Sequence, residues 1–423
     1  MKKILIITGL MFMMILNVKI HAKDNPLLKP FDTPFGVPPF DKIKNEHFKP
    51  AFETAIKKHD EEIKQIAESK SLPTFENTVE ALELSGDLLN DVSTIFYNLN
   101  SANTNPELQG IAKDIAPKLS EHNDNILLNA SLFEKIKTVY DNRKNLRLNN
   151  EQSKLLEETY RNFVKSGANL NEQQKAKLRE INQKMSLLTL KFGENILKET
   201  NSFQLVIDNE KDLSGLPQSI IDGAKDAAKS KKLDGKWLFT LHNPSVMPFL
   251  QYSSNRELRK KIQQAYINRG NNGNEFDNKK IIEDIVNLRT EKAQLLGYQS
   301  YADFVLDETM AKTPAKVYEL LNRLWEPAIK VAKNEAKELQ SMIDREGGKF
   351  KLEAYDWRYY AEKLRKEKYD LDEEEIRPYL KLENVRDGIF ELTKRLYGIT
   401  YKVRNDIPKY HEDAVVYEVI DKD

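Results

Sequence analysis

The sequence has 423 residues, enough for two or three domains, and its 66 lysines and arginines equal its 66 aspartates and glutamates, so no basic excess indicates a nucleic-acid-binding protein. Because 40% of the residues are hydrophobic and only 16 are glycine and 16 proline, the composition favours a folded, helix-rich protein over a disordered one. Cysteine is absent, which excludes disulfides, thiolate metal sites and a cysteine nucleophile.

Residues 1–22 have the pattern of a secretory signal peptide. Lys2 and Lys3 precede an apolar run that starts at Ile4 and ends before Asn17, and Ala22 offers a small residue for cleavage. A membrane anchor is the alternative, but the run is shorter than the ~20 residues that span a bilayer. We therefore expect export, a mature chain with no stable membrane span, and a periplasmic location.

Residues 23–40 are rich in proline, which predicts an extended arm that cannot be helical. Residues 41–200 form a predicted N-terminal helical region. Its first helix begins near Ile43 and ends at a break before Pro73. A second helix begins near Thr74, and its core-facing apolar stripe extends to Leu99.

Further breaks are predicted at residues 123–125 and 141–150. The next helix is the clearest in this region, because Asn171 can cap it with Gln174 at the third position. Its core-facing stripe is predicted to consist of Leu178, Ile181, Met185, Leu188, Phe192 and Ile196.

Residues 201–255 form a predicted small mixed α/β segment. Residues 203–207 and 236–241 are predicted strands, and Leu216 and Pro217 open a short helix between them. A small sheet is therefore expected here.

Residues 256–423 are predicted to be helical until the last twenty or so. A polar loop at residues 270–278 separates two helices, and a further helix begins at Pro314. The last helix is expected to bury one side, formed by Val385, Ile389, Leu392 and Leu396. Residues 401–403 and 414–420 are predicted strands, and the second is expected to lack a returning partner, which favours a truncated chain.

Residues 356–380 combine two predicted helical pieces. Trp357, Tyr360 and Leu364 fall on one helical face, and Asp372 with Glu375 has the form of a capping box for the second piece. In a sequence with 66 carboxylates, a pair of this kind indicates a helix cap and a solvated face and not a general acid and base.

These residues resemble the M3 family of zinc metallopeptidases, and the peptidyl-dipeptidases within it more than the oligopeptidases. The resemblance continues through residues 38–53, 72–86, 162–170 and 289–314 and covers nearly the whole chain after the first two dozen residues. It implies a mainly α, multi-helix, two-lobed architecture with small β elements beside a deep channel.

The zinc-binding H-E-x-x-H helix of that family is absent from the sequence. The six histidines are His21, His47, His59, His122, His242 and His411. No two are four residues apart, as two ligands on one helical face would be, and His411-Glu412 is followed by valine at position 415.

The resemblance implies that the complete family enzyme holds zinc with two histidines and a glutamate and releases C-terminal dipeptides from an oligopeptide substrate. None of those ligands has a counterpart here, so no catalytic or metal-binding residue is assigned and no cofactor is expected to bind this chain. Tyr359 and Tyr360 are candidates for lining a peptide channel, with ordinary core or surface packing as the alternative.

The leading hypothesis is the N-terminal portion of a secreted peptidyl-dipeptidase, truncated before the zinc-binding helix and inactive alone. The alternatives are an oligopeptidase, or a non-catalytic helical module that binds peptides or pairs with a separate catalytic half. An in-frame H-E-x-x-H in the downstream DNA would favour the first hypothesis. The sequence predicts no oligomeric state.

Overall fold

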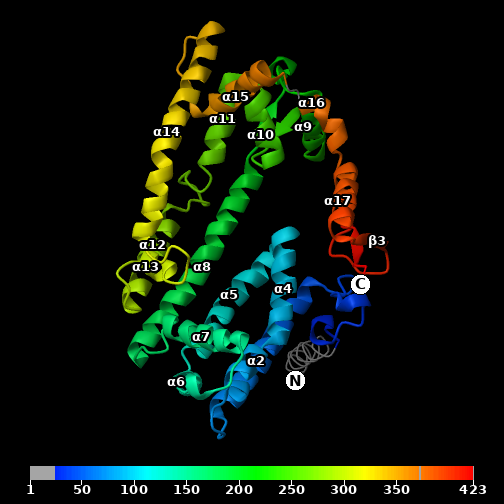
Figure 1. The fold of residues 1–423 in the computed structure, drawn as a ribbon. Helices are drawn as coiled ribbons and strands as arrows, with labels where there is room; N and C mark the ends of the chain where they lie inside the picture. Colours follow the sequence, from blue (N-terminus) through cyan, green and yellow to red (C-terminus); the bar gives the residue numbers. More distant parts are fainter. Residues whose placement is uncertain (1–23, 371–372, 423) are drawn as a thin grey trace, which may run out of the picture. The chain divides into compact units, whose positions relative to one another are not determined.

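The computed structural model describes residues 24–370 and 373–422 (Figure 1). The predicted signal peptide and Asp372 of the predicted capping box lie outside the described residues. The described chain is mainly α-helical with small antiparallel sheets, which confirms the predicted fold class.

The chain divides into two compact units. Unit 1 consists of the described residues within Met1–Leu187, Leu295–Gly297 and Ile389–Asp423, and unit 2 of Leu188–Gln294 and Tyr298–Gly388. The predicted division at residues 40, 200 and 255 stays a prediction.

Unit 1 contains a helical array and a short hairpin. Its elements are η1 (Pro26–Leu28), η2 (Pro34–Gly36), η3 (Asn45–His47), α2 (Phe48–Glu68), η4 (Phe75–Glu80), α3 (Ala81–Glu83), α4 (Asp87–Ala102), α5 (Pro106–Leu127), α6 (Ala130–Asp141), η5 (Arg143–Asn145), α7 (Asn150–Lys165), the first part of α8 (Glu172–Ser202), the second part of α17 (Leu382–Tyr397), β3 (Thr400–Arg404) and β4 (Val416–Ile420).

Aromatic packing joins α2 to α4 in the core of unit 1. The ring of Phe96 meets those of Phe48 and Phe52 edge to face, with centroids 5.1 and 5.3 Å apart, and all three side chains are buried. Such pairs add to the stabilisation that apolar burial alone provides.

Three predictions for unit 1 are wrong in detail. The arm is not wholly extended, because short 3₁₀ turns begin at Pro26 and Pro34, and proline is compatible with the first position of a helical turn. The second predicted helix is interrupted at Gly86, whose φ of +83° ends the regular helical path. The break predicted at residues 123–125 is absent, because α5 continues to Leu127 and Asn129 caps α6 instead.

The terminal strand has one partner, and the sheet that it forms has two strands, so its second edge is unpaired among the described residues, as the sequence predicts. β4 pairs antiparallel with β3 in the register Thr400 to Ile420. The loop that joins them is long, so the sequence pattern did not indicate a hairpin between these two runs. Tyr401 of β3 stacks on Phe390 of α17, with ring centroids 3.9 Å apart.

Unit 2 contains the predicted small sheet and a second helical array. Its elements are the second part of α8, β1 (Leu205–Ile207), η6 (Glu210–Leu213), α9 (Gln218–Ser230), β2 (Trp237–Phe239), α10 (Asn243–Tyr252), α11 (Arg256–Ile267), α12 (Lys279–Leu295), α13 (Tyr301–Leu306), α14 (Pro314–Arg345), α15 (Ala354–Tyr369), α16 (Glu373–Ile376), η7 (Arg377–Leu380) and the first part of α17.

The predicted sheet and the predicted cap are both confirmed. β1 pairs antiparallel with β2, and one face of the pair packs with α9, α10 and α11 around Phe239 and Phe249. At the start of α8, Asn171 accepts a hydrogen bond from the Gln174 amide, and the Gln174 side chain accepts one from the Asn171 amide. Of the predicted stripe, Leu178 and Ile181 are fully buried and the later members partly so.

The predicted buried side of the last helix is exposed in the structure. The exposed fractions of Val385, Ile389, Leu392 and Leu396 on α17 are between 40 and 62%. Periodicity locates an apolar face but not what covers it. On α14 a second series of exposed apolar side chains comprises Tyr318, Leu320, Leu321, Leu324, Trp325 and Val331.

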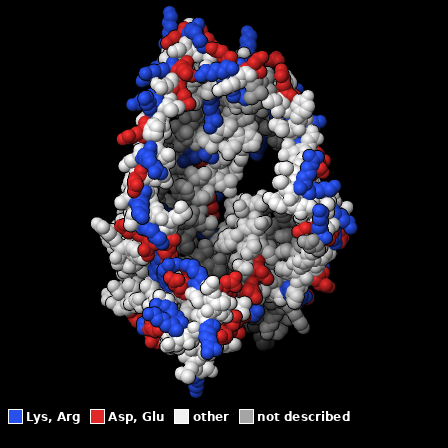
Figure 2. Space-filling model, in the orientation of Figure 1, with Lys and Arg blue, Asp and Glu red and all other residues white. Residues whose placement is uncertain are grey.

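Lysine and arginine side chains are interspersed with aspartate and glutamate on the face that Figure 2 shows. Several are paired along one helix, as Lys184 is with Glu180 and Lys280 with Asp284. This mixture differs from the one-signed basic patch typical of nucleic-acid-binding proteins. Among the described helices, none combines the length and the apolar character needed to cross a membrane.

Replacing Phe96 with alanine should destabilise the chain by about 3–5 kcal/mol, because the cavity left between α2 and α4 cannot be filled by its neighbours. Chemical denaturation followed by circular dichroism measures the change. The control is Leu84→Ala at an exposed turn, which should change stability by no more than ~0.5 kcal/mol. Equal effects of the two substitutions would contradict the assignment of Phe96 to the core.

Candidate functional site

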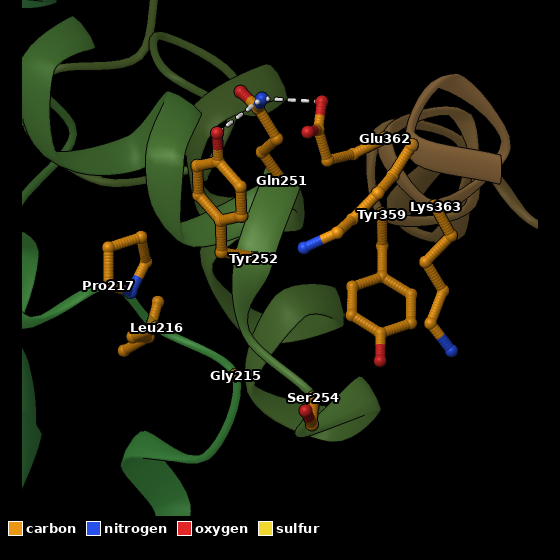
Figure 3. A pocket seen from close by; sticks show the side chains of 10 residues that line it. Gly215, Leu216, Pro217, Gln251, Tyr252, Ser254, Tyr359, Glu362 and Lys363 are labelled. Carbon is orange, nitrogen blue, oxygen red and sulfur yellow. Dashed lines mark hydrogen bonds between the residues drawn. The ribbon is translucent and has the colours of Figure 1, made fainter. Parts of the chain in front are cut away.

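A cavity of about 450 Å³ lies within unit 2, between the end of α10, the loop before α9 and one face of α15. Its lining consists of Gly215, Leu216, Pro217, Gln251, Tyr252, Ser254, Tyr359, Glu362, Lys363 and Lys366. Figure 3 shows Tyr252 and Gln251 on one side and Tyr359, Glu362 and Lys363 on the other. The lining therefore combines aromatic surface with charged and amide groups.

Gly215 allows the loop to lie close against the end of α10. Its φ is +86°, and a Cβ atom there would lie 2.5 Å from Ser254 Oγ and against the Tyr252 carbonyl oxygen. The Ser254 amide donates a hydrogen bond to the Ser214 carbonyl oxygen at 2.8 Å, which fixes this close approach. A residue with a side chain would push this wall of the cavity out of place.

The polar groups of the lining are held by hydrogen bonds. Gln251 Nε2 donates to Tyr252 Oη at 3.0 Å and to Glu362 Oε2 at 2.9 Å, drawn in Figure 3. Arg365 donates to both carboxylate oxygens of Glu362, at 2.9 and 2.6 Å. The Glu362 carboxylate is therefore fixed before any ligand enters.

Lys363 is fixed in a similar way on the same helix. Its ammonium group lies 2.6 and 2.7 Å from the two carboxylate oxygens of Glu346, and 5.0 Å from the ring centroid of Tyr359. Burial alone would lower the pKa of Lys363, but the hydrogen bond to Glu346 and the electrostatic interactions with Tyr359 and Glu346 together outweigh this, and the pKa is raised. The side chain therefore brings a positive charge to the cavity at neutral pH.

A buried carboxylate anchors the N-terminal turn of α15 behind this cavity. Asp356 is 0% exposed and accepts hydrogen bonds from Arg256 Nε and Nη2 at 3.0 and 2.8 Å and from Arg259 Nη2 at 2.9 Å. It also accepts one from the Glu353 amide at 3.2 Å, as part of a capping box. The hydrogen bonds that Arg256 donates to Asp356 raise the pKa of Arg256.

Arg259 connects this anchor to the cavity. It is 1% exposed and donates to the carbonyl oxygens of Ser253 and Tyr355, at 2.8 and 3.1 Å. Its guanidinium carbon lies 4.2 Å from the ring centroid of Tyr359, a cation–π distance. One side chain of α11 thus joins the end of α10 to the start of α15 and holds the Tyr359 ring.

The two tyrosines predicted to line a channel have different surroundings. Tyr359 lines the cavity, whereas Tyr360 is 6% exposed and packs with Leu339, Met342 and Ile343 of α14. Burial raises the pKa of Tyr360. Whether either residue contacts a peptide stays a prediction.

Most of the lining was not indicated by the sequence pattern. Gln251 and Tyr252 lie at the end of a short helix, and Glu362 is one of many carboxylates on a charged helix face. The sequence carries one usable signal, the Gly215-Leu216-Pro217 turn before α9, because glycine followed by proline commonly marks a tight loop.

The histidines do not form the zinc site that the family resemblance implies. The structure brings His59 and His122 together, with His59 Nδ1 and His122 Nε2 2.9 Å apart. Their other ring nitrogens lie 3.1 Å from Ser85 Oγ and 2.8 Å from Asp60 Oδ1. Every ring nitrogen of the pair therefore already has a partner, and a zinc site needs at least three protein ligands converging on one point.

The other described histidines, His47, His242 and His411, give no better fit. The Lys44 amide donates a hydrogen bond to His47 Nδ1. His242 lies next to Thr240 and Asn201, and His411 Nδ1 accepts a hydrogen bond from the Asp413 amide. Across residues 24–370 and 373–422, no three histidine or acidic side chains are arranged to hold a metal ion. The described residues thus do not fit a catalytic zinc ion.

Comparison with known proteins agrees with the family resemblance of the sequence. A family model described as Peptidase family M3 matches residues 249–423. The chain is 36% identical to a dipeptidyl carboxypeptidase of Escherichia coli (strain K12), 35% to a dipeptidyl carboxypeptidase of Salmonella typhimurium, and 33% to an oligopeptidase A of Escherichia coli (strain K12). Each match covers 94% of this chain but only 58 or 59% of the relative. The chain therefore spans less than two thirds of the length of these relatives.

Replacing Asp356 with alanine should destabilise the chain by about 3–5 kcal/mol, because two guanidinium groups would lose the carboxylate that compensates their burial. Urea denaturation measures the loss. The matched control is Glu367→Ala on the same helix, whose exposed ion pair with Arg345 should contribute no more than ~1 kcal/mol. If both substitutions cost the same, Asp356 is not the anchor of α15.

Proposed function

The chain belongs to peptidase family M3, and on that premise we propose that it forms the oligopeptide-binding part of a peptidase of the peptidyl-dipeptidase type. The observation that carries this proposal is the match to two dipeptidyl carboxypeptidases over 94% of the chain, at 36 and 35% identity. An oligopeptidase is the alternative within the family, supported by 33% identity to an oligopeptidase A over the same share.

The cavity beside α15 is the site that we propose for contact with the peptide. Its volume of about 450 Å³ lies within the ~300–1,000 Å³ usual for small-ligand sites. Tyr252 and Tyr359 offer aromatic surface to an apolar side chain, and the ammonium group of Lys363 offers a charge to a peptide carboxylate or carbonyl oxygen. Because these groups are held by neighbours, binding orders few side chains and loses little entropy.

We further propose that these 423 residues do not hydrolyse peptides by themselves. The sequence contains no H-E-x-x-H, and its six histidines include no pair at that spacing. Zinc belongs to the complete family enzyme in this proposal, and no step of hydrolysis is assigned to residues of this chain. Export to the periplasm stays part of the proposal, supported by the charged and apolar pattern of residues 1–22.

A helical module that pairs with a separate catalytic half is the second candidate. It is favoured by apolar side chains on α14 that are about half exposed or more, including Leu321, Leu324 and Trp325. Exposed apolar series of this kind are typical of surfaces that bind another polypeptide.

The purified chain, supplied with zinc, should release no dipeptide from N-blocked tripeptides and tetrapeptides, yet it should bind them. Product analysis by mass spectrometry and binding by calorimetry measure the two properties separately. Release of a C-terminal dipeptide that a chelator abolishes would contradict the proposed inactivity, and absence of binding to every peptide tried would contradict the proposed binding role.

Replacing Gly215 with alanine should weaken tetrapeptide binding about tenfold or more, equivalent to about 1.4 kcal/mol, because the added Cβ displaces the cavity wall. Calorimetric titration measures the affinity. Gly235→Ala is the matched control, because its φ of +76° imposes a similar backbone cost of ~1–2 kcal/mol while no atom lies within 4 Å of the added Cβ. Equal affinities for the two variants would remove the cavity from the binding proposal.

A further inference from the structure

His59 and His122 form a chain of hydrogen bonds that joins three segments of unit 1. His59 and Asp60 belong to α2, His122 to α5, and Ser85 to the turn between α3 and α4. The chain runs from Ser85 Oγ to His59 Nε2 at 3.1 Å, from His59 Nδ1 to His122 Nε2 at 2.9 Å, and from His122 Nδ1 to Asp60 Oδ1 at 2.8 Å. His122 is only 5% exposed, so water cannot easily replace these partners.

The His59 ring also packs against the start of α4. A Cβ atom on Gly86 would lie 2.7 Å from His59 Cε1, so the ring occupies the space that any other residue at position 86 would fill. The Gly86 amide donates to Glu62 Oε2 at 2.9 Å, which holds the same turn to α2. Ser85 Oγ lies 2.7 Å from the Leu82 carbonyl oxygen, to which it can donate.

The number of protons on the two histidine rings decides whether this series of hydrogen bonds can stay intact. With both rings neutral, Ser85 donates to His59, His59 donates to His122, and His122 donates to the Asp60 carboxylate. With one added proton, the two links between Ser85, His59 and His122 reverse their direction. Ser85 then donates to the Leu82 carbonyl oxygen, and His59 donates to Ser85. His122, now protonated on both ring nitrogens, donates to His59 and to Asp60. Both states satisfy all three links.

A second added proton cannot be accommodated. It would have to reside on His59 Nδ1, where it would face the N–H of His122 Nε2 across 2.9 Å. Two donors then meet with no acceptor between them, and two cationic rings face each other at a centroid distance of 4.8 Å. The link between α2 and α5 must therefore break.

The surrounding groups influence the second protonation of His59. The charged groups that act on His59 are His122 on α5 and Asp60 and Glu62 on α2, and the turn before α4 contributes the Ser85 hydroxyl and the Gly86 amide. Glu62 itself lies 3.6 Å from Lys58, which weakens its attraction for a proton on His59. The positive end of the α4 dipole further disfavours a proton on His59, because the N-terminus of α4 lies next to that ring.

We propose that the His59–His122 pair is an acid-sensitive latch. It holds the turn between α3 and α4 against α2 and α5 while the hydrogen bond between the two rings is intact, and it releases that turn when both rings are doubly protonated. Burial, followed by the charge of His122, lowers the pKa of His59 from its ordinary 6.5, in agreement with this geometry. Since the unfolded chain then takes up the proton first, the contribution of the latch is complete above pH 6.5 and is lost as the pH falls toward the lowered pKa.

Hydrogen–deuterium exchange of the full chain tests the latch. After correction for intrinsic exchange, amides of residues 82–90 should exchange about tenfold or more faster near pH 5 than near pH 7.5, as expected when protonation loosens a histidine-held contact. In His59→Asn, the Oδ1 atom can accept from His122 but cannot be protonated, so this acceleration should disappear. His242→Asn is the matched control and should retain it, because His242 bonds to Thr240 and Asn201 in unit 2.

Two results would overturn the proposal: equal protection of residues 82–90 at both pH values in the wild-type chain, or an acceleration in His59→Asn equal to that of the wild type. If His59→Asn does not fold, nitrogen-15 spectra of histidine-labelled wild-type chain decide. They should show a single proton on the His59 ring near pH 7.5 and a second one that is taken up only below pH 6.5. Two protons on that ring at neutral pH would refute the latch.

Discussion

The structure of unit 2 depends on how one buried carboxylate is compensated. Burying an ion without a partner costs several kcal/mol, and Asp356 is 0% exposed. Arg256 and Arg259 supply four of its hydrogen bonds and the Glu353 amide a fifth, so the carboxylate is satisfied from α11 and from the start of α15 at once. The position of α15 relative to α11 is thereby fixed, and with it the wall of the cavity that carries Tyr359.

A second buried carboxylate in unit 2 is compensated without any cation. Glu199, near the end of α8, accepts hydrogen bonds from the Gly270 amide and from the side chains of Asn272 and Asn274, the latter two at 2.6 and 2.8 Å. Burial alone would raise the pKa of Glu199, but these donors more than offset it and the pKa is lowered. Glu199 therefore helps to order the polar loop at residues 270–278, and two asparagine side chains of that loop serve as its donors.

Periodicity and capping located most helices, but not the contacts that organise them. The face of Trp357, Tyr360 and Leu364 was recognisable because those residues share one side of a single helix. Asp356 and Arg259 are 97 residues apart, and neither stands out in a sequence with 66 residues of each charge. His59 and His122 are 63 residues apart and were invisible to a search for ligands at helical spacing, because packing of α2 on α5 creates their pairing.

The origin of the cavity bears on how binding and hydrolysis can be separated. All of its lining comes from three short segments of unit 2, residues 215–217, 251–254 and 359–366. Its shape is set by the Gly215 turn and the Asp356 anchor, and its charges by ion pairs within α15 and to Glu346. The residues that shape the site proposed for peptide contact all lie within unit 2. The peptide binding that we propose can therefore be measured on this chain without any catalytic turnover.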